Sequence, residues 1–395
     1  MELLELIETI RQGDADVNRI FAGDGVSVRS GVPKGQAYQK KLLETAQFIA
    51  DVKAGRRSPW QLQEAMSTSD FPLLFGDIFD RQMLAAYREW PNQWDRIAKK
   101  VTARDFRTMQ LLPPLIGGTG RMDEVGQLEE YPEAAVSEQA RIEYKVKKFG
   151  RRFSISWETI IGDLMGQFDD LPQRLARAAR RTEDRAVTEL FVDLNGPHAS
   201  FYTVGDKNII NTTNGAATNN PALSIAGLQD AMTVITNQRD EDGEPIFLDM
   251  VTLVVPPALE VTALNILNAL QMEIVEAGGT ANQKLIAVNW MKQKVTLVVM
   301  PYIPMIATTA NGDRSWFLFA NPNVNREGIR VAHLTGHEEP EIWIKEPNAR
   351  RIGGGAVAPI DGDFDTDAIA YRARHVFGTT RVDPKATVAS NGSGA

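Results

Sequence analysis

The sequence of 395 residues contains no cysteine. This absence excludes disulfide bonds, thiolate zinc sites, iron–sulfur clusters and cysteine nucleophiles together. No apolar run approaches the roughly 18 residues of a membrane-spanning helix, and segment 1–10 carries three glutamates instead of the basic lead of a secretory signal. We therefore expect a soluble, unsecreted protein with no membrane partner, whose durability comes from packing and assembly.

The chain also lacks a net positive charge, because its formal net charge is -8 at pH 7. Free-standing nucleic-acid-binding proteins depend on a net basic surface that releases counterions from the phosphates. Hydrophobic residues make up 43% of the chain, which is enough to bury a sizeable core, and the length allows two or three domains. The sequence therefore predicts a globular protein in which contact with DNA is confined to local basic faces.

Two strand-like segments enclose a polar stretch between residues 110 and 142. That stretch is rich in turn formers and charges, which a buried sheet would not tolerate. After it, Ile142, Tyr144 and Val146 alternate with charged residues in the period-two pattern of a strand. A two-stranded hairpin is at best marginally stable alone in water. We therefore expect an extended arm that becomes ordered by lying on another subunit.

The tip of this hairpin is acidic. Its carboxylates are Asp123, Glu124, Glu129, Glu130 and Glu133. Complementary charges at an interface fix the register of two partners more than they raise affinity. We therefore predict that the tip lies across a basic surface of a neighbouring subunit.

A long helix follows the hairpin. Asp169 and Asp170 stand where carboxylates favour a helix start, Pro172 suits the first turn, and an Asn-Gly pair at 195–196 supplies a stop. The arginines that we consider as contacts between subunits are Arg174, Arg177, Arg181 and Arg185. The nearby carboxylates are Glu183, Asp184 and Glu189. They leave a second interpretation open, in which i,i+4 ion pairs lie on a solvated helix face.

Helices and strands alternate after residue 196 in the manner of a compact α/β domain. We predict helices at 224–238 and 256–270, a loop at 271–287, and strands at 250–255, 294–300, 315–320, 329–334, 341–344 and 367–382. Near the N-terminus, helical segments at 1–11, 38–54 and 59–66 form an arm rather than a domain. The helical stretch 70–99 is expected to dock on the first strand of the hairpin.

The chain offers little catalytic chemistry. His333, His337 and Glu338 have the spacing of a metal-binding set only if they share one helix face. A turn-forming Thr-Gly pair falls between the two histidines, so we expect them to face different ways and to bind no metal. His198 and His375 look isolated. No carboxylate pair or glycine-rich loop has the context of a catalytic or phosphate-binding site, so the sequence predicts no enzyme and no cofactor.

Four segments occur in an order that is typical of one family. They are FSISWETI (153–160), LVVPPAL (253–259), VTLVV (295–299) and YRARHVFG (371–378). Together with the hairpin arm and the long helix, they give the chain from residue 71 onward a resemblance to the major capsid proteins of tailed bacteriophages, with Mu-like head subunits as the nearest group. Encapsulins share this fold.

The resemblance implies an α+β fold, the tailed-phage major capsid fold. The implied parts are an N-terminal helical region and arm (1–100), an extended β-hairpin loop (101–155), a peripheral domain (156–221) with a long spine helix at about 170–195, an axial α/β domain (222–335), and a return to the peripheral domain with a C-terminal tail (336–395).

By the same resemblance, the chain is a structural subunit of a virion. Its copies would form pentamers and hexamers that tile an icosahedral head shell around a double-stranded DNA genome, after assembly in the cytoplasm of a bacterial host. Implied partners are further copies of the chain, scaffolding and portal proteins, a decoration protein as an additional candidate, and packaged DNA through nonspecific contacts. Two alternatives stay open: an encapsulin-type compartment shell, and a metal-dependent hydrolase that uses His333, His337 and Glu338.

Overall fold

The computed structural model describes most of the chain beyond residue 70. The described residues are 44, 45, 47, 48, 51, 56, 57, 71–111, 124–127, 142–156, 165–239, 246, 250–269, 271–275, 284–289, 291–323, 326–345, 364–366 and 368–394. The predicted N-terminal helices therefore lie outside the described residues, apart from a few positions. Within the described part, no helix is long and apolar enough to cross a membrane.

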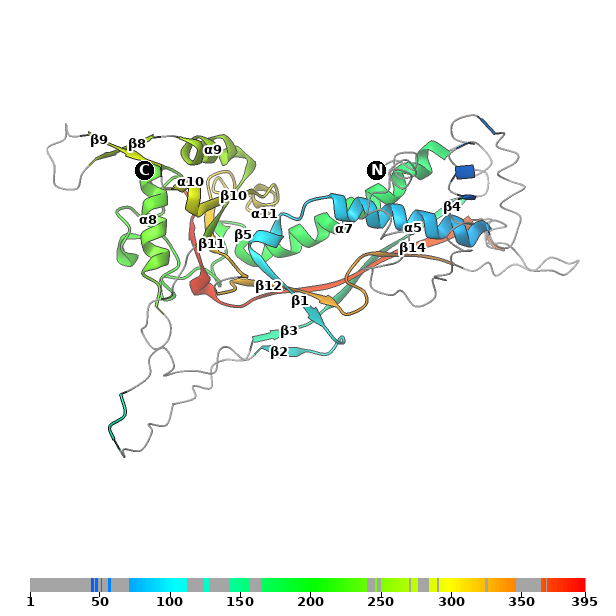
Figure 1. Ribbon diagram of the computed structural model, residues 1–395, viewed down its shortest axis with the longest axis horizontal. Helices are drawn as coiled ribbons and strands as arrows, with labels where there is room; N and C mark the ends of the chain where they lie inside the picture. Colours follow the sequence, from blue (N-terminus) through cyan, green and yellow to red (C-terminus); the bar gives the residue numbers. More distant parts are fainter. Residues whose placement is uncertain are drawn as a thin grey trace, which may run out of the picture.

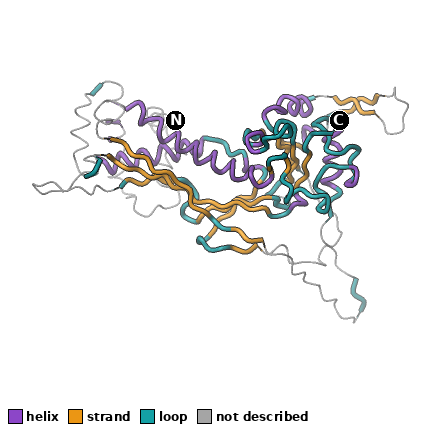
Figure 2. The backbone as a smooth tube through the Cα atoms, turned by 180° about the vertical axis from the view of Figure 1, so that it is seen from behind, coloured by secondary structure: helices purple, strands orange, loops and turns teal. Residues whose placement is uncertain are grey.

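A five-stranded sheet runs along the long axis of the molecule (Figure 1; Figure 2). Its strands are β1 (Ala98–Ala103), β4 (Lys147–Ser156), β12 (Ile329–Leu334), β13 (Glu341–Ile344) and β14 (Ala368–Arg381). The order is β1-β12-β14-β13, and β4 also pairs with β14. Because β13 and β4 both pair with residues 371–374 of β14, they lie on opposite edges of it. β14 is therefore the central strand, and the long strand predicted near the C-terminus is confirmed.

Two helices lie side by side over one face of this sheet (Figure 1). They are α5 (Phe71–Glu89) and α7 (Met165–Phe191). Met83, Ala86 and Tyr87 of α5 form an apolar cluster with Ala176 of α7. The backbone N–H of Ile342 in β13 also donates to Asp80 of α5 at 3.2 Å. The prediction that this helix docks on the first hairpin strand is therefore wrong, because α7 and β13 provide its packing surface.

The long helix is confirmed, but its ends differ from the prediction. α7 begins four residues before Asp169, so Pro172 lies inside the helix, and it ends at Phe191. Directly after it, β5 (Val192–Asp193) pairs with β6 (Gly196–Pro197), which ends the helix before the predicted Asn-Gly stop. Gly196 has a φ of 108°, a left-handed conformation that glycine adopts without steric cost.

A four-stranded sheet is the second main sheet of the molecule. Its order is β10 (Val295–Val299), β7 (Val251–Val255), β11 (Trp316–Ala320) and β15 (Thr387–Ser390). Leu253 and Val255 face a core that includes α8 (Ile225–Thr236) and α9 (Glu260–Asn268). Val254 faces the opposite core, which contains Phe191 at the end of α7. Because both faces of this sheet are covered, the sequences of its strands are nearly continuous apolar runs.

Two hairpins extend from the sheets. β2 (Met109–Leu111) pairs antiparallel with β3 (Ile142–Tyr144), which confirms the base of the predicted hairpin. β8 (Gln271–Val275) pairs with β9 (Lys284–Val288) where we predicted a loop. The short elements are η1 (Trp94–Arg96), η2 (Thr212–Asn214), η3 (Pro257–Leu259), η5 (Pro384–Ala386), α10 (Met291–Lys294) and α11 (Ile303–Ile306).

The predicted domain boundaries stay a prediction, and strand pairing bears on two of them. β12 lies within the predicted axial range but pairs with β1 and β14 in the five-stranded sheet. β15 lies within the predicted return to the peripheral domain but pairs with β11 in the four-stranded sheet. The chain therefore crosses between the two sheets more often than the linear divisions suggest.

Candidate functional site

The four predicted arginines of α7 differ in their surroundings. Arg174, Arg181 and Arg185 are exposed, whereas Arg177 is half-buried. The guanidinium of Arg177 lies 4.9 Å from the ring centroid of Trp90. Arg185 pairs with Glu189 at 2.8 Å, one helical turn away. The interpretation as local i,i+4 pairing therefore holds for Arg185, while Arg177 is occupied by an aromatic contact.

A groove of about 560 Å³ brings three of these arginines together beside α7. Arg174, Arg181 and Arg185 line it with Arg151 of β4 and Arg374 of β14. Its apolar lining comprises Met83, Phe149, Leu175, Ala178, Ala179, Met305, Pro340 and Ala373. None of the described residues that line this groove is an aspartate or glutamate. The groove is thus basic and apolar in a chain of net negative charge.

A second basic surface lies on the opposite face of the five-stranded sheet. The register places Arg372 of β14 between Trp343 of β13 and Arg152 of β4. Directly paired residues share one face of a sheet, and this face is opposite that of His375, which points to α7. Lys148, Arg152 and Arg372 are exposed, and Trp343 is 48% exposed. We call these four residues the basic row.

Most of the acidic tip lies outside the described residues: this holds for Asp123, Glu129, Glu130 and Glu133. Glu124 is described and exposed. The described piece 124–127 lies far from α7 of the same subunit (Figure 1). A contact between this piece and an α7 arginine would therefore require another copy of the chain.

A buried polar cluster joins α7 to four other elements, centred on the fully buried Glu183. The Tyr87 hydroxyl of α5 donates to Glu183 Oε1 at 2.6 Å. Trp94 Nε1 of η1 donates to Oε2 at 3.1 Å, and Arg180 Nη1 lies 3.3 Å from the same oxygen. A buried carboxylate is stable only when its oxygens are paired in this way.

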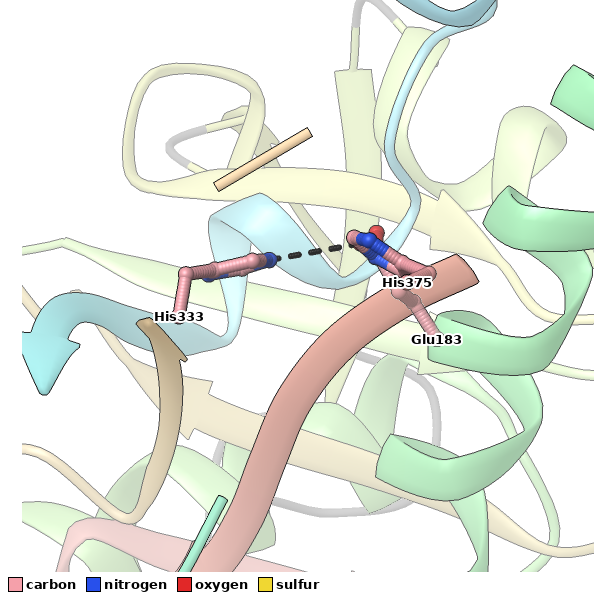
Figure 3. Close-up of side chains that lie close together, drawn as sticks. All are labelled: Glu183, His333 and His375. Carbon is pink, nitrogen blue, oxygen red and sulfur yellow. Dashed lines mark hydrogen bonds and ion pairs between the residues drawn. The ribbon is translucent and has the colours of Figure 1, made fainter. Parts of the chain in front are cut away.

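Two histidines complete the cluster (Figure 3). His375 Nε2 of β14 and His333 Nε2 of β12 lie 2.6 Å and 3.3 Å from Glu183 Oε1. An ionised carboxylate only accepts hydrogen bonds, so both Nε2 atoms carry the proton. Burial alone would raise the pKa of Glu183, but the hydrogen bonds from the histidines outweigh it and hold this pKa well below its ordinary value. Burial lowers the pKa of His333.

The three side chains have a possible metal-ligand geometry, since their ligand atoms lie within 4.8 Å of one another. A metal-bound histidine normally donates its other ring N–H to an acceptor. Here the Nδ1 atoms of His333 and His375 are buried with no hydrogen-bond partner in the described part of the chain. The positive charge of Arg180 beside Glu183 further opposes a cation. The geometry therefore favours a hydrogen-bonded cluster that holds helices and sheet together.

The hydrolase alternative conflicts with the structure. His333 points to Glu183, whereas the turn after β12 carries His337 to Glu341, with which its Nδ1 pairs. Glu338 accepts instead from the backbone N–H of Gly336 at 3.0 Å. The side chains of His333, His337 and Glu338 therefore do not converge on one point. The cause is the turn at Gly336, whose φ is 80°.

Local patterns in the sequence do not reveal this cluster. The prediction that His375 is isolated is wrong, because its Nε2 lies 2.6 Å from Glu183, and the sequence indicates Glu183 only as a charge that balances nearby arginines. One signal was available, because Ala176, Glu183 and Val187 lie seven and four residues apart on one helix stripe, and all three are buried. A carboxylate within a buried stripe predicts a buried partner. The identity of that partner depends on strands some 150 and 192 residues away.

Asp184, the next residue of α7, experiences the charge of this cluster. Burial, together with the neighbouring Glu183 carboxylate, raises the pKa of Asp184 to about 7. Its Oδ1 atom is buried without a hydrogen-bond partner in the part of the chain that the structure describes. The ionised form of Asp184 is therefore unfavourable in the folded subunit.

Comparisons with solved structures find similarity over much of the chain at low sequence identity. A structure from Mycobacterium phage Patience is 14% identical, with 80% of this chain and 86% of that chain covered and a TM-score of 0.43. The holo-SrpI encapsulin complex from Synechococcus elongatus PCC 7942 is 11% identical, with 77% and 89% covered and a TM-score of 0.43. The procapsid of satellite phage P4 is 13% identical, with 78% and 96% covered and a TM-score of 0.39.

No curated protein sequence matches the chain. A family match covers residues 139–390, which include the second hairpin strand, α7, the whole four-stranded sheet and every strand of the five-stranded sheet except β1. The matched family is described as phage capsid protein. Its span includes the candidate contact surfaces on α7 and on β13 and β14, and the α+β fold is that of the predicted capsid subunits. The chain belongs to the phage capsid protein family.

Proposed function

We propose that this chain is the subunit that assembles, through pentamers and hexamers, into the icosahedral head shell around the double-stranded DNA of a tailed bacteriophage. The observation that carries the proposal is the phage capsid family match over residues 139–390. Because function then resides in interfaces, the proposal needs neither a catalytic site nor a cofactor.

The two sheets suggest a division of roles. The five-stranded sheet with α5 and α7 is the proposed peripheral domain, and α7 is its spine helix. The four-stranded sheet with α8 and α9 is the proposed axial domain, near the centre of each pentamer or hexamer. In this proposal β12 is assigned to the peripheral domain and β15 to the axial domain, as their strand pairing supports.

The predicted site residues take part in contacts between subunits. For the acidic tip, the basic row of a neighbouring subunit is the proposed receptor, because carboxylates of the tip complement Lys148, Arg152 and Arg372. The arginines of α7 are a second contact region. Charge pairing of this kind mainly sets register and discriminates against wrong partners.

Repetition makes weak contacts sufficient. A contact of about -4 kcal/mol has a dissociation constant near 1 mM by itself. In a closed symmetric shell each subunit is held by several neighbours at once, so the contacts act together. Weak individual contacts also allow a misplaced subunit to leave before the shell closes.

Electron microscopy of the negatively stained protein tests the proposal, with the chain expressed alone and with its genomic neighbours. Shells, tubes or rings of subunits are expected at near-physiological salt. A uniform population of monomers or dimers under both conditions would contradict a shell function. The contents of closed shells separate the alternatives: DNA indicates a virus head, whereas enclosed protein indicates an encapsulin-type compartment.

The same co-expression addresses the proposed partners. Scaffolding and portal proteins are expected to change the yield or the uniformity of shells, and a decoration protein is expected to bind only after assembly. Packaged DNA is expected to contact basic side chains without sequence preference, so these contacts weaken as salt is raised. Assembly in the bacterial cytoplasm is part of the same proposal.

Deletion of residues 118–130 tests the role of the hairpin tip. The deletion removes turn and tip residues but leaves the paired strands β2 and β3. We expect a folded subunit with an unchanged melting temperature that fails to form closed shells. The control is a deletion of residues 277–282, which shortens the β8-β9 hairpin and likewise leaves its paired strands in place. Closed shells of normal size from the tip deletion would show that the tip is dispensable.

A further inference from the structure

The groove beside α7 is basic in a chain whose net charge is negative. Arg151, Arg174, Arg181 and Arg185 line it, and none of its described lining residues is a carboxylate, although the chain as a whole has eight more acidic than basic residues. The fifth lining arginine, Arg374, already pairs with Glu341 at 2.6 Å. Arg151 and Arg181 are exposed and form no ion pair within the described ranges. The apolar floor of the groove is unsuited to the phosphate backbone of a nucleic acid. The groove is therefore suited to an acidic, amphipathic peptide segment.

The N-terminal segment of this same chain has that character. Residues 1–10 read MELLELIETI. At 100° per residue, Leu3, Leu6, Ile7 and Ile10 fall on one helix stripe, and the three glutamates fall on the opposite half. A ten-residue helix is about 15 Å long. The groove runs along α7 from Arg174 to Arg185, and that stretch is about 16 Å long by the same helical rise.

We propose that segment 1–10 of a neighbouring subunit docks in this groove, with its apolar stripe on the floor and its glutamates against the arginines. The inference rests on the proposed shell, because only an assembly places a neighbour beside the groove. A helix this short is marginal in water by itself. Docking would supply the apolar surface that the segment needs in order to fold.

The length of the intervening chain permits this contact. Residues 11–70 separate the segment from α5, and 60 residues can reach about 90 Å even at the helical rise of 1.5 Å per residue. Phe71 lies about 18 Å along α5 from Met83, which lines the groove. An exchange between adjacent subunits is therefore within the reach of the chain. The acidic tip, by contrast, is assigned to the basic row on the other face of the sheet.

The absence of cysteine makes a direct test possible. Ile7→Cys combined with Ala178→Cys introduces the only two thiols of the chain, and Ala178 is an exposed residue of the groove. After mild oxidation of assembled shells, we expect covalent dimers and longer ladders on a non-reducing gel. The matched control pairs Ile7→Cys with Ala199→Cys, since Ala199 is exposed but lies beyond the end of α7. The groove pair is expected to exceed the control at least about tenfold, because docking raises the effective concentration to the millimolar range.

The remaining outcomes overturn the proposal in distinct ways. An internal crosslink at monomer size would place the segment in the groove of its own subunit. Crosslinking of Val125→Cys, rather than Ile7→Cys, to Ala178→Cys would assign the groove to the hairpin tip. Intact shells without either crosslink would reject docking while leaving the shell function in place. Failure of the parent chain to form shells would instead reject the proposed function.

A charge exchange supplies a second readout that does not depend on thiols. Arg181→Glu is expected to lower shell yield several-fold, most strongly at low salt, where screening is weakest. Adding Glu5→Lys to this variant is expected to restore much of the yield. Equal yields for Arg181→Glu with and without Glu5→Lys would contradict the pairing, and Arg107→Glu, which alters a residue with a 91% exposed side chain, controls for net charge.

Discussion

The two sheets of the subunit are stabilised by different means. The four-stranded sheet is covered on both faces, and most of its side chains are apolar: Trp316 and Leu318 pack on one side, Phe317 and Phe319 on the other. The five-stranded sheet is covered by helices on the face of His375, where a buried glutamate makes the connection. Part of its other face carries the basic row, exposed to solvent.

This difference separates stability from assembly. A sheet with two apolar faces stabilises the subunit and has little surface left for specific contacts. A sheet with one polar, exposed face can form charged contacts with neighbours, but its covered face needs hydrogen bonds to fix how the helices lie on it. Point changes in the two regions should therefore affect different measurements.

Phe317→Ala should have the largest effect on subunit stability. The ring is fully buried and packs edge-on against Phe191 at 5.0 Å. Removing a buried phenyl ring costs about 3–5 kcal/mol through lost burial and the cavity left behind. Chemical denaturation should show this loss in the free energy of unfolding. Phe106→Ala is the control, because Phe106 is 46% exposed. An equal loss of stability in both variants would contradict the conclusion that burial against the four-stranded sheet stabilises the subunit.

Glu183→Gln should destabilise the five-stranded side by about 3 kcal/mol at pH 7, because the buried donors lose a charged acceptor. The pKa of Glu183 is lowered in the folded state, so its stabilising contribution is present above the ordinary pKa of 4.5 and is lost as pH falls through its depressed value. The difference between parent and variant should therefore shrink in acid.

Glu189→Gln is the matched control for this variant. Its carboxylate pairs with Arg185 on the exposed face of α7, and an exposed ion pair of this type contributes little to stability because water screens it. Hydrogen exchange localises the effect: Glu183→Gln should increase exchange in α5 and β14 more than in β7. Uniform exchange across both sheets would show that the cluster does not act locally.

Asp184→Asn should stabilise the subunit by about 2 kcal/mol at pH 8. The raised pKa of about 7 means that the folded subunit retains a proton which the unfolded chain has lost, so the parent loses stability as pH rises from about 4 to 7. The gain from asparagine should accordingly be full above pH 7 and vanish towards pH 4. Thermal melts across this range measure it, with the half-exposed Asp105→Asn as control. A gain that does not change with pH would have another cause.

Arg372→Glu should have the smallest effect on stability, within about 0.5 kcal/mol, as is usual for exposed positions. Light scattering should nevertheless show slower assembly, and more so at low salt. Combining it with Glu129→Lys and Glu130→Lys should recover assembly if the tip lies on the basic row. Lack of recovery, together with normal subunit melting, would exclude that pairing.

Local patterns in the sequence predicted much of the fold. The period of apolar residues and the terminal signals indicated α7, α8 and α9, and β7 and β10 followed from their β-branched runs. The position of β15 beside β11, and that of β12 beside β1, could not be predicted, because a strand does not encode its partner locally. The same reason hides the cluster around Glu183, whose distant partners come from four other elements of the chain.

The link between β14 and β15 has a mechanical consequence. Only residues 382–386 join the strand at the centre of one sheet to an edge strand of the other, and they include η5 and Pro384. Arg381, just before the link, donates to the carbonyl of Leu190 at 2.6 Å, and Asp383 pairs with Arg326 at 2.7 Å. A link this short, held by contacts at both of these residues, restricts rotation of one sheet relative to the other. A twist applied to one end of the subunit would be transmitted along β14 as strain in both sheets, and the subunit would deform as a single lever.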